Sequence, residues 1–199
     1  MTLILASNNA HKLREFGEIL AADGIEIISQ REAGCDFEVD ETGDTFEENA
    51  FLKAEAAMRA SGLAAVSDDS GLEVDALGGE PGVRSARYTG RHEDTDHDRR
   101  LYLLQKLEGE EHRSARFVSA ICCAFPNGDI LRARGECEGL ITREMRGENG
   151  FGYDSIFMPL GFDRTMAEIS AEEKNKISHR GSALRIFAEE LRKYYGDNN

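Results

Sequence analysis

The fold begins with a strand and a turn that are predicted by the stretch LILASNNAHK, residues 3–12. Its first four residues are apolar, as in a short buried strand, and Ser7–Asn9 is a polar turn that ends the strand. Apolar residues then recur at the spacing of an amphipathic helix, at Leu13, Phe16 and Leu20. Gly24 is expected to end that helix, and Ile25–Ile28 has the composition of a second strand. A strand, a helix and a second strand in this order favour an α/β fold.

Three more helices are expected further along the chain. Capping boxes, in which a Ser or Thr side chain and a Glu three residues later bond to each other's backbone, mark helix starts at Thr45–Glu48 and Ser170–Glu173. Gly62 is expected to end the first of these helices. Leucines at helical spacing predict another helix over Asp94–Leu107.

The remaining strands are expected in the middle of the chain. Leu63–Val66 reads as a short strand that runs into the polar segment 67–71. Arg116–Phe125 and Ile130–Ile141 flank a turn and predict a long antiparallel hairpin, whose second strand alternates between apolar and charged residues. The sequence therefore predicts an α/β fold: a mixed sheet with flanking helices.

Composition limits the classes of function. The 199 residues include 24 Lys and Arg against 38 Asp and Glu, so the formal net charge is −14. This balance disfavours binding to nucleic acid or to an anionic membrane surface. It does not exclude a small phosphate ligand, because a few basic side chains and backbone N–H groups can form a local positive site. The length fits one domain, residues 1–199.

The cysteines and the apolar segments indicate where the protein works. The four cysteines make no C-x-x-C pair, so we expect buried thiols in a reducing compartment; they are Cys35, Cys122, Cys123 and Cys137. The apolar start of the chain is too short for a signal peptide, and Phe117–Phe125 is too short for a membrane span. A cytoplasmic location is expected.

The first candidate site is the turn at Ser7–Lys12, which comprises Ser7, Asn8, Asn9, Ala10, His11 and Lys12. A turn from a strand into a helix directs backbone N–H groups and the positive end of the helix at one point, where a phosphate can bind. The segment lacks the glycines of a P-loop. The alternative interpretation is an ordinary helix cap followed by a solvated Lys12.

The second candidate is Asp68–Gly71, expected at the C-terminal end of a strand, with Asp40 and Glu41 upstream. Adjacent carboxylates repel unless they share a cation, and hard oxygen ligands of this kind suit Mg²⁺. Ligands also bind at strand C-termini in α/β sheets. The alternative is a turn with solvated carboxylates.

Two later segments carry weaker signals. Gly150–Asp154 places an aromatic residue between glycines, which can expose a flat ring for stacking on a base. Residues 172–181 bring Lys, His and Arg together near expected helix ends, and such side chains can bind phosphate or donate to a base carbonyl. The alternatives are a packed loop and a solvated connection between helices.

Together these segments resemble the signature blocks of one family. The blocks are residues 7–15, 41–54, 68–82, 151–154 and 178–181. They occur in order and nearly without gaps, so the chain is similar to the inosine/xanthosine triphosphate pyrophosphatases, the Ham1-like dITP/XTP pyrophosphatases. Residues 89–114 match no block of that family.

The resemblance implies an elongated fold in which two lobes flank a central cleft, and a homodimer. It also implies Mg²⁺-dependent hydrolysis of deaminated purine nucleoside triphosphates, namely ITP, dITP, XTP and dXTP. The products would be the monophosphate and pyrophosphate, and the enzyme would cleanse the nucleotide pool.

The resemblance also assigns roles by position. Ser7–Lys12 and Lys53 would hold the triphosphate, and Ser70 would contact the substrate. Asp69 would be the catalytic carboxylate, as a base or as a group that orients water, and a Mg²⁺ ligand together with Glu41. The base pocket and its phosphate-facing rim would be formed by Phe151, Gly152, Tyr153, Asp154, Lys174, His179 and Arg180.

Base specificity would follow from hydrogen bonding. Hypoxanthine and xanthine carry a carbonyl at C6, where adenine carries an amino group, so donors from His179, Arg180 or a backbone N–H would favour the deaminated bases. Such a site can reject the mismatched analogue by roughly 10⁴ or more. Two alternatives stay open: a Maf-like nucleotide pyrophosphatase that acts on other bases, and a nucleotide sensor without catalysis.

Overall fold

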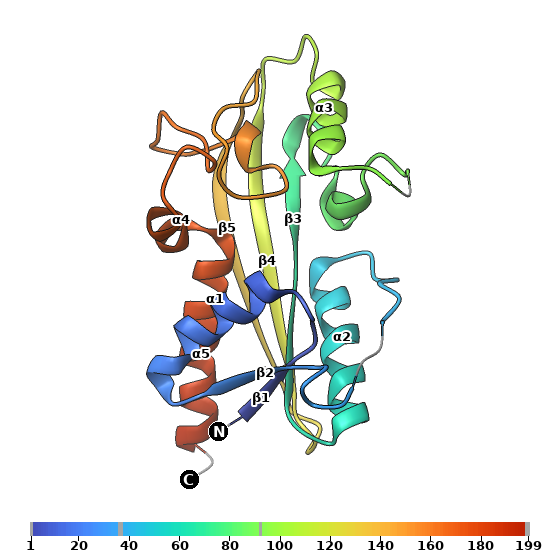
Figure 1. The fold of residues 1–199 in the computed structure, drawn as a ribbon, viewed down its shortest axis with the longest axis vertical. Coiled ribbons are helices and arrows are strands. Elements are labelled where there is room, and N and C mark those ends of the chain that lie inside the picture. The colour runs from blue at the N-terminus through green and yellow to red at the C-terminus, as the bar shows by residue number, and fades with distance from the viewer. Residues whose placement is uncertain (1, 36–37, 92, 198–199) are drawn as a thin grey trace. The chain divides into compact units, whose positions relative to one another are not determined.

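A single six-stranded sheet organises the chain (Figure 1). The structure is a computed structural model and describes residues 2–35, 38–91 and 93–197. The strands are β1 (Thr2–Leu5), β2 (Glu26–Ser29), β3 (Ala65–Val74), β4 (Ser114–Ala124), β5 (Ile130–Ile141) and β6 (Phe157–Pro159). Their order in the sheet is β2-β1-β3-β4-β5-β6. β1 pairs in parallel with β2 and β3, while β5 and β6 are antiparallel, so the sheet is mixed as predicted.

Two helices begin at the capping boxes that the sequence predicts. The helices are α1 (Ala10–Leu20), α2 (Phe46–Ser61), α3 (Asp96–Lys106), α4 (Ala171–Ile177) and α5 (His179–Asp197). The capping boxes of Thr45–Glu48 and Ser170–Glu173 are both formed. A third box, between Thr95 and Asp98, starts α3 two residues later than the leucine spacing predicts. Within the described ranges, no helix is long and apolar enough to cross a membrane.

The contacts divide the chain into two compact units. Unit 1 comprises Met1–Asp69, Ser119–Gly135 and Arg180–Asn199, and unit 2 comprises Ser70–Val118 and Glu136–His179. Strands β3, β4 and β5 each contribute residues to both units. The expectation of one domain over residues 1–199 stays a prediction.

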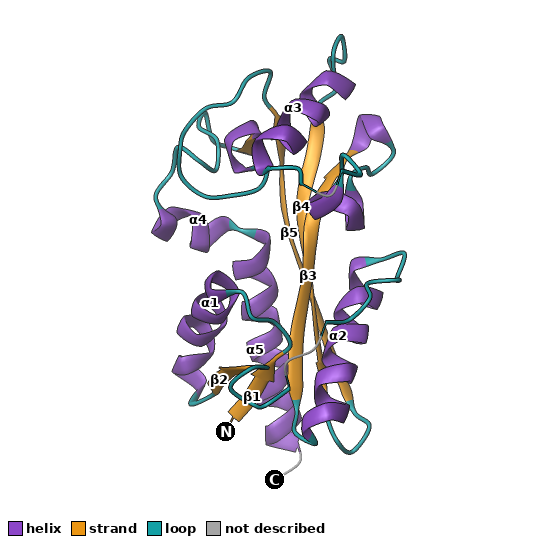
Figure 2. Ribbon diagram, turned by 45° about the vertical axis from the view of Figure 1, so that its right-hand side comes forward, coloured by secondary structure: helices purple, strands orange, loops and turns teal. Residues whose placement is uncertain are grey.

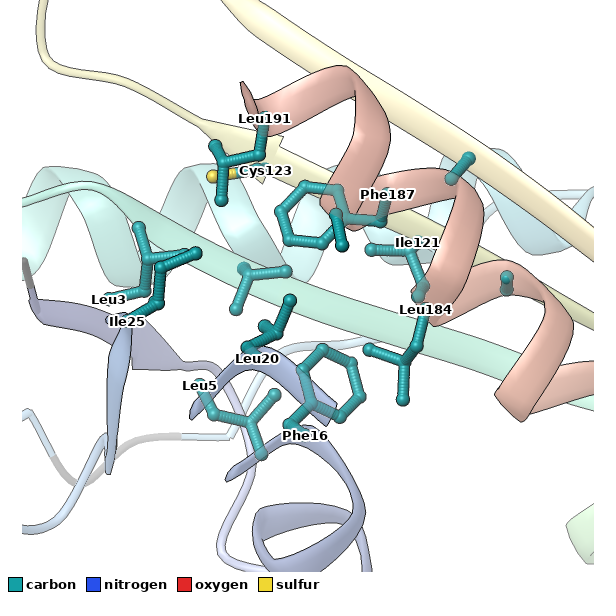
Figure 3. Close-up of a cluster of buried hydrophobic side chains, with 14 of the residues drawn as sticks. Leu3, Leu5, Phe16, Leu20, Ile25, Ile121, Cys123, Leu184, Phe187 and Leu191 are labelled. Carbon is teal, nitrogen blue, oxygen red and sulfur yellow. The ribbon is translucent and has the colours of Figure 1, made fainter. Parts of the chain in front are cut away.

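One core of unit 1 joins α1 and α5 to the sheet (Figure 3). Phe16 of α1 and Phe187 of α5 are fully buried against strand residues such as Leu5. Neighbouring residues of a strand face opposite sides, so Leu3 and Leu5 lie in this cluster whereas Ile4 lies in another. The apolar stripe that the sequence predicts for α1 therefore fixes that helix on one face of the sheet.

Helix α2 covers the other face (Figure 2). Its buried residues include Ala50, Ala54 and Ala57, and their small side chains let the helix backbone approach the strands closely. On β4 the adjacent thiols lie in different clusters: Cys122 packs with α2, and Cys123 packs with α1 and α5. All four cysteines are buried free thiols, which confirms that part of the prediction.

Unit 2 has a core of its own. Leu72 of β3, Phe117 of β4 and Phe157 of β6 belong to one buried cluster, and the rings of Phe117 and Phe157 lie 4.5 Å apart between centroids. Strand β5 has the bounds that the sequence predicts, and its burial alternates residue by residue from Ala133 to Ile141. Strand β6 is only three residues long and was not predicted.

The largest correction concerns β3. The sequence predicted a strand that ends at Val66 and is followed by the polar segment 67–71, but β3 runs without interruption from Ala65 to Val74. The pair Asp68 and Asp69 therefore lies in the interior of a strand and not at its C-terminal end. Two carboxylates can occupy such a position only because side chains from distant segments neutralise them, and a local pattern does not contain that information.

Truncation of Phe187 tests the contribution of the α5 core. Phe187→Ala is expected to lower the free energy of unfolding by about 3–5 kcal/mol, because a fully buried aromatic ring leaves a cavity. The measurement is urea unfolding followed by circular dichroism. The neighbouring Ile186 is 40% exposed, so Ile186→Ala is the matched control and should cost less than about 1 kcal/mol. Equal effects of the two substitutions would contradict the packing described for α5.

Candidate functional site

The site of unit 1 is built on two consecutive aspartates of β3. Asp68 and Asp69 follow one another in the strand, so their side chains point to opposite faces of the sheet. The side chain of Asp68 is fully buried, and that of Asp69 is 12% exposed. Each carboxylate meets basic or amide side chains from the helices that cover its own face.

Asp68 faces α1 and the start of α5. Lys12 Nζ lies 2.8 Å from Asp68 Oδ1, and Arg180 Nε donates to Asp68 Oδ2 at 3.2 Å. Arg180 also donates to Glu15 Oε2 on α1, at 2.7 Å. Burial acts to raise the pKa of Asp68, but the charges of Lys12 and Arg180 outweigh it and hold this pKa well below its usual range. Asp68 is therefore ionised and links the two helices.

The turn that precedes α1 is a helix cap that also positions a lysine. Asn9 Oδ1 accepts hydrogen bonds from the backbone N–H groups of His11 and Lys12, and Ser7 Oγ accepts one from Asn9 N–H. The capping interpretation of this segment is therefore correct. A solvated Lys12 is not, because its side chain is 19% exposed and paired with Asp68.

Asp69 faces α2. Lys53 Nζ donates to Asp69 Oδ1 at 3.0 Å and to Glu41 Oε1 at 2.8 Å. Asn49 Nδ2 donates to Asp69 Oδ2 at 3.3 Å, and its Oδ1 accepts from Gly43 N–H at 2.8 Å. One amide thus connects Asp69 to the loop that carries Glu41. This fully buried side chain fixes both carboxylates relative to α2.

Burial and charge act in opposite directions on the pair of Asp69 and Lys53. Burial, together with the nearby charge of Glu41, raises the pKa of Asp69 above its usual value, although Lys53 opposes the shift. Burial acts to lower the pKa of Lys53, but Asp69 and Glu41 outweigh it and raise this pKa. Two carboxylates therefore converge on one cationic nitrogen at a site that is largely shielded from water.

This donor set fits a divalent cation. Among the described residues no group of three or more His, Cys, Asp and Glu side chains is arranged to hold a metal ion. However, Mg²⁺ typically takes one or two protein carboxylates and fills its other positions with water and substrate phosphates. Glu41 and Asp69 already approach a common point, the ammonium nitrogen of Lys53.

The charges of unit 1 support the same conclusion. The charged side chains of this cluster are Lys12, Lys53, Arg180, Glu15, Glu41, Asp68 and Asp69. The carboxylates outnumber the basic groups by one, so the cluster by itself does not attract an anion. A bound divalent cation would reverse the sign, and a polyphosphate could then bind.

A second group of predicted residues lies in unit 2, around the loop Phe151–Asp154. Asp154 Oδ2 accepts from Phe151 N–H at 2.8 Å and from Lys174 Nζ at 2.5 Å. Lys174 Nζ also lies 4.7 Å from the centroid of the Phe151 ring. The Phe151 side chain is 49% exposed, whereas Asp154 is buried. A Cβ on Gly150 would lie 2.1 Å from Asp154 Oδ2, so only glycine fits there.

Two aromatic contacts complete this part of unit 2. Tyr153 is buried and its hydroxyl donates to the Ser85 carbonyl at 2.8 Å, so within this loop Tyr153 is the packed anchor and Phe151 the accessible ring. Burial also raises the pKa of Tyr153. The half-buried imidazole of His179 stacks on Phe117, with ring centroids 4.9 Å apart and planes at 19°.

The predicted site residues thus form two groups. Those of unit 1 are Ser7, Asn8, Asn9, Ala10, His11, Lys12, Glu41, Lys53, Asp69 and Arg180; those of unit 2 are Ser70, Phe151, Gly152, Tyr153, Asp154, Lys174 and His179. That any of them contacts a substrate or metal stays a prediction. The sequence analysis assigned no role to Glu15 or Asn49, although both lie in the signature blocks, and it missed the pairing of Asp68. A polar Asn49 on the otherwise apolar stripe of α2 was the available signal.

Comparisons with known proteins agree with this architecture. The family model described as the Ham1 family matches residues 3–190. A dITP/XTP pyrophosphatase of Desulforamulus reducens is 48% identical, and the match covers 98% of each chain. A protein with the same name from Bacillus subtilis is 47% identical over 92% of each chain.

Solved structures give the same result. The Ham1 protein of Staphylococcus aureus is 42% identical, with a TM-score of 0.90 over 98% of this chain and all of that one. The HAM1 protein of Coxiella burnetii is 43% identical, with a TM-score of 0.91 over 97% of this chain and 99% of that one. The fold is that of an α/β protein with a mixed sheet and flanking helices. The chain belongs to the Ham1 family, which confirms the resemblance found in the sequence.

Removal of the Asp68 charge tests the ion-pair network. Asp68→Asn should lower the free energy of unfolding by about 3 kcal/mol, because Lys12 and Arg180 each lose a buried ion pair with Asp68. Chemical unfolding at neutral pH measures this change. Asp163→Asn removes a carboxylate that is 98% exposed, and it should leave the free energy of unfolding unchanged. A neutral effect of Asp68→Asn would show that the network contributes nothing to stability.

Proposed function

We propose that this protein is a Mg²⁺-dependent pyrophosphatase that hydrolyses dITP, ITP, XTP and dXTP to the monophosphate and pyrophosphate. The observation that carries the proposal is the convergence of Glu41 and Asp69 on the ammonium nitrogen of the largely buried Lys53. The names of the relatives support the substrate class.

The reaction breaks the anhydride bond between the α- and β-phosphates. A water oxygen attacks the α-phosphorus, one of its protons is removed, and pyrophosphate leaves with the electron pair of the broken bond. Such transfers depend chiefly on positioning and on stabilising the negative charge that develops on the phosphate oxygens. Bound Mg²⁺ supplies part of that positive charge. Lys12 and Lys53 would supply the rest.

Asp69 is suited to accept a proton from the attacking water or to orient that water. Asn49 and Lys53 each donate to a different oxygen of this carboxylate, so its plane is fixed relative to α2. Its raised pKa makes it a better proton acceptor than an exposed aspartate, because a more basic carboxylate binds a proton more tightly. Asp69 is therefore held in a defined orientation, from which it could accept a proton or orient a water.

Recognition of the base is assigned to unit 2. The exposed ring of Phe151 offers a flat surface for a purine, and Lys174 and His179 offer donors that would pair with a C6 carbonyl. An amino group at C6, as in ATP, would then face a donor. Arg180 is 5% exposed and contacts Asp68 and Glu15, so its contact with a base stays a prediction.

The homodimer and the cytoplasmic location also stay predictions. The buried free thiols support a reducing compartment. Light scattering of the purified protein tests the dimer, and cell fractionation tests the location.

A substrate panel tests the proposed function. With Mg²⁺ present, ITP and XTP should yield pyrophosphate and monophosphate, while GTP, ATP, dTTP and UTP should react far more slowly. ATP carries an amino group at C6, where the deaminated purines carry a carbonyl. Guanine shares the C6 carbonyl, so the rejection of GTP must depend on contacts near C2. Pyrophosphate and orthophosphate are measured separately. Activity should disappear when EDTA removes the metal ion.

Other outcomes of the panel would indicate a different class of protein. Release of orthophosphate alone would indicate a phosphatase. Preference for a pyrimidine would favour the Maf-like alternative, and binding of ITP without turnover would favour the sensor.

Replacement of Asp69 tests the assignment of the catalytic carboxylate. Asp69→Asn is expected to reduce kcat by about a hundredfold or more, because the amide neither accepts a proton nor carries the charge that holds Mg²⁺. Circular dichroism checks that the fold is retained. The control is Asp75→Asn, which removes a half-exposed carboxylate paired with Arg116 and should keep wild-type turnover. Near wild-type kcat in Asp69→Asn would refute this role.

A further inference from the structure

Helix α3 holds both backbone groups of Gly152, the residue that follows the exposed Phe151. Gly152 N–H donates to Asp96 Oδ2 at 2.6 Å, and the Gly152 carbonyl accepts from Arg100 NH1 at 3.2 Å. Residues 96 and 100 are one turn apart on α3 and share a face of that helix. One helical face therefore clamps a single glycine at both its donor and its acceptor.

The Asp96 carboxylate, one of the two side-chain groups that clamp Gly152, is itself held in place. The other oxygen of Asp96 pairs with Arg99, which also pairs with Asp94. The capping box of Thr95 fixes the start of α3 one residue before Asp96. The Asp96 carboxylate thus has a defined orientation, although its side chain is 39% exposed.

The loop needs such a restraint. Gly150 and Gly152 both have positive φ values, +78° and +57°, in a region that other residues rarely adopt. Phe151 lies between them and is 49% exposed, and Lys174 Nζ lies 4.7 Å from the centroid of its ring. Fixing both backbone groups of Gly152 limits the orientations that the Phe151 ring can take.

We propose that Asp96 and Arg100 are positioning residues for purine recognition, acting through the backbone of Gly152. The inference rests on the proposed function, in which Phe151 stacks on the base. It gives a role to part of residues 89–114, a segment that lies outside the signature blocks found in the sequence. Neither side chain has to contact the substrate. Each restrains the loop before the substrate binds, so the loop loses less conformational freedom on binding.

Four variants test this proposal through steady-state kinetics with ITP. Asp96→Ala and Arg100→Ala should each raise KM about tenfold, the equivalent of one charge-assisted hydrogen bond, while kcat changes less than about threefold. Asp96→Asn keeps an acceptor and Arg100→Lys keeps a donor, so both should recover most of the loss. Inhibition by inorganic tripolyphosphate, which lacks a base, should stay unchanged in all four variants.

The matched control lies on the same helix. Lys106→Ala removes an ion pair with Glu80 at the other end of α3 and should leave KM, kcat and the melting temperature near wild type. A tenfold rise of KM in Lys106→Ala would show that any perturbation of α3 has this effect. An unchanged KM in both alanine variants at positions 96 and 100 would also overturn the proposal.

Amide hydrogen exchange separates the clamp from the proposed function. The Gly152 amide should be protected in the wild type and should exchange at least about tenfold faster in Asp96→Ala. If the wild type releases no pyrophosphate from ITP, the proposed function fails, and with it the role in purine recognition. Unchanged exchange at Gly152 in an enzyme that hydrolyses ITP would refute the clamp alone.

Discussion

The burial of two adjacent aspartates in the interior of β3 is the constraint on which unit 1 depends. Because alternate strand residues face opposite sides, Asp68 faces the layer formed by α1 and α5, and Asp69 faces the layer formed by α2. Each layer must supply cations or amides at that level of the strand, or a buried charge is left without compensation. The pairing of these charges acts together with the apolar cores to set where the three helices dock and how the site is arranged.

The two aspartates have different roles because their surroundings differ. Asp68 meets two basic side chains and is held ionised, which suits a structural link between helices. Asp69 meets one lysine, one amide and a second carboxylate, and its pKa is raised. Identical side chains on neighbouring residues therefore differ in basicity because of what each face of the sheet presents. Only the more basic of the two retains some exposure to solvent.

The sequence predicts the local features of this fold well and its distant contacts poorly. The caps at Thr45 and Ser170 depend on residues three positions apart, and both were found as predicted. The continuation of β3 through Asp68 depends on Lys12 and Arg180, which are 56 and 112 residues away. Read without those partners, an Asp-Asp pair indicates a turn. The role of Asn49 was missed for the same reason, because its partner Asp69 is 20 residues away.

The adjacent thiols of β4 have a practical consequence. Burial raises the pKa of Cys122 to about 11 and raises that of Cys123 as well, so neither forms an appreciable amount of thiolate at neutral pH. Cys35 and Cys137 are also buried. Electrophilic labels such as maleimides should therefore leave the native protein largely unmodified. A cysteine introduced at an exposed position would then accept a fluorophore or spin label selectively, with no need to replace the natural cysteines.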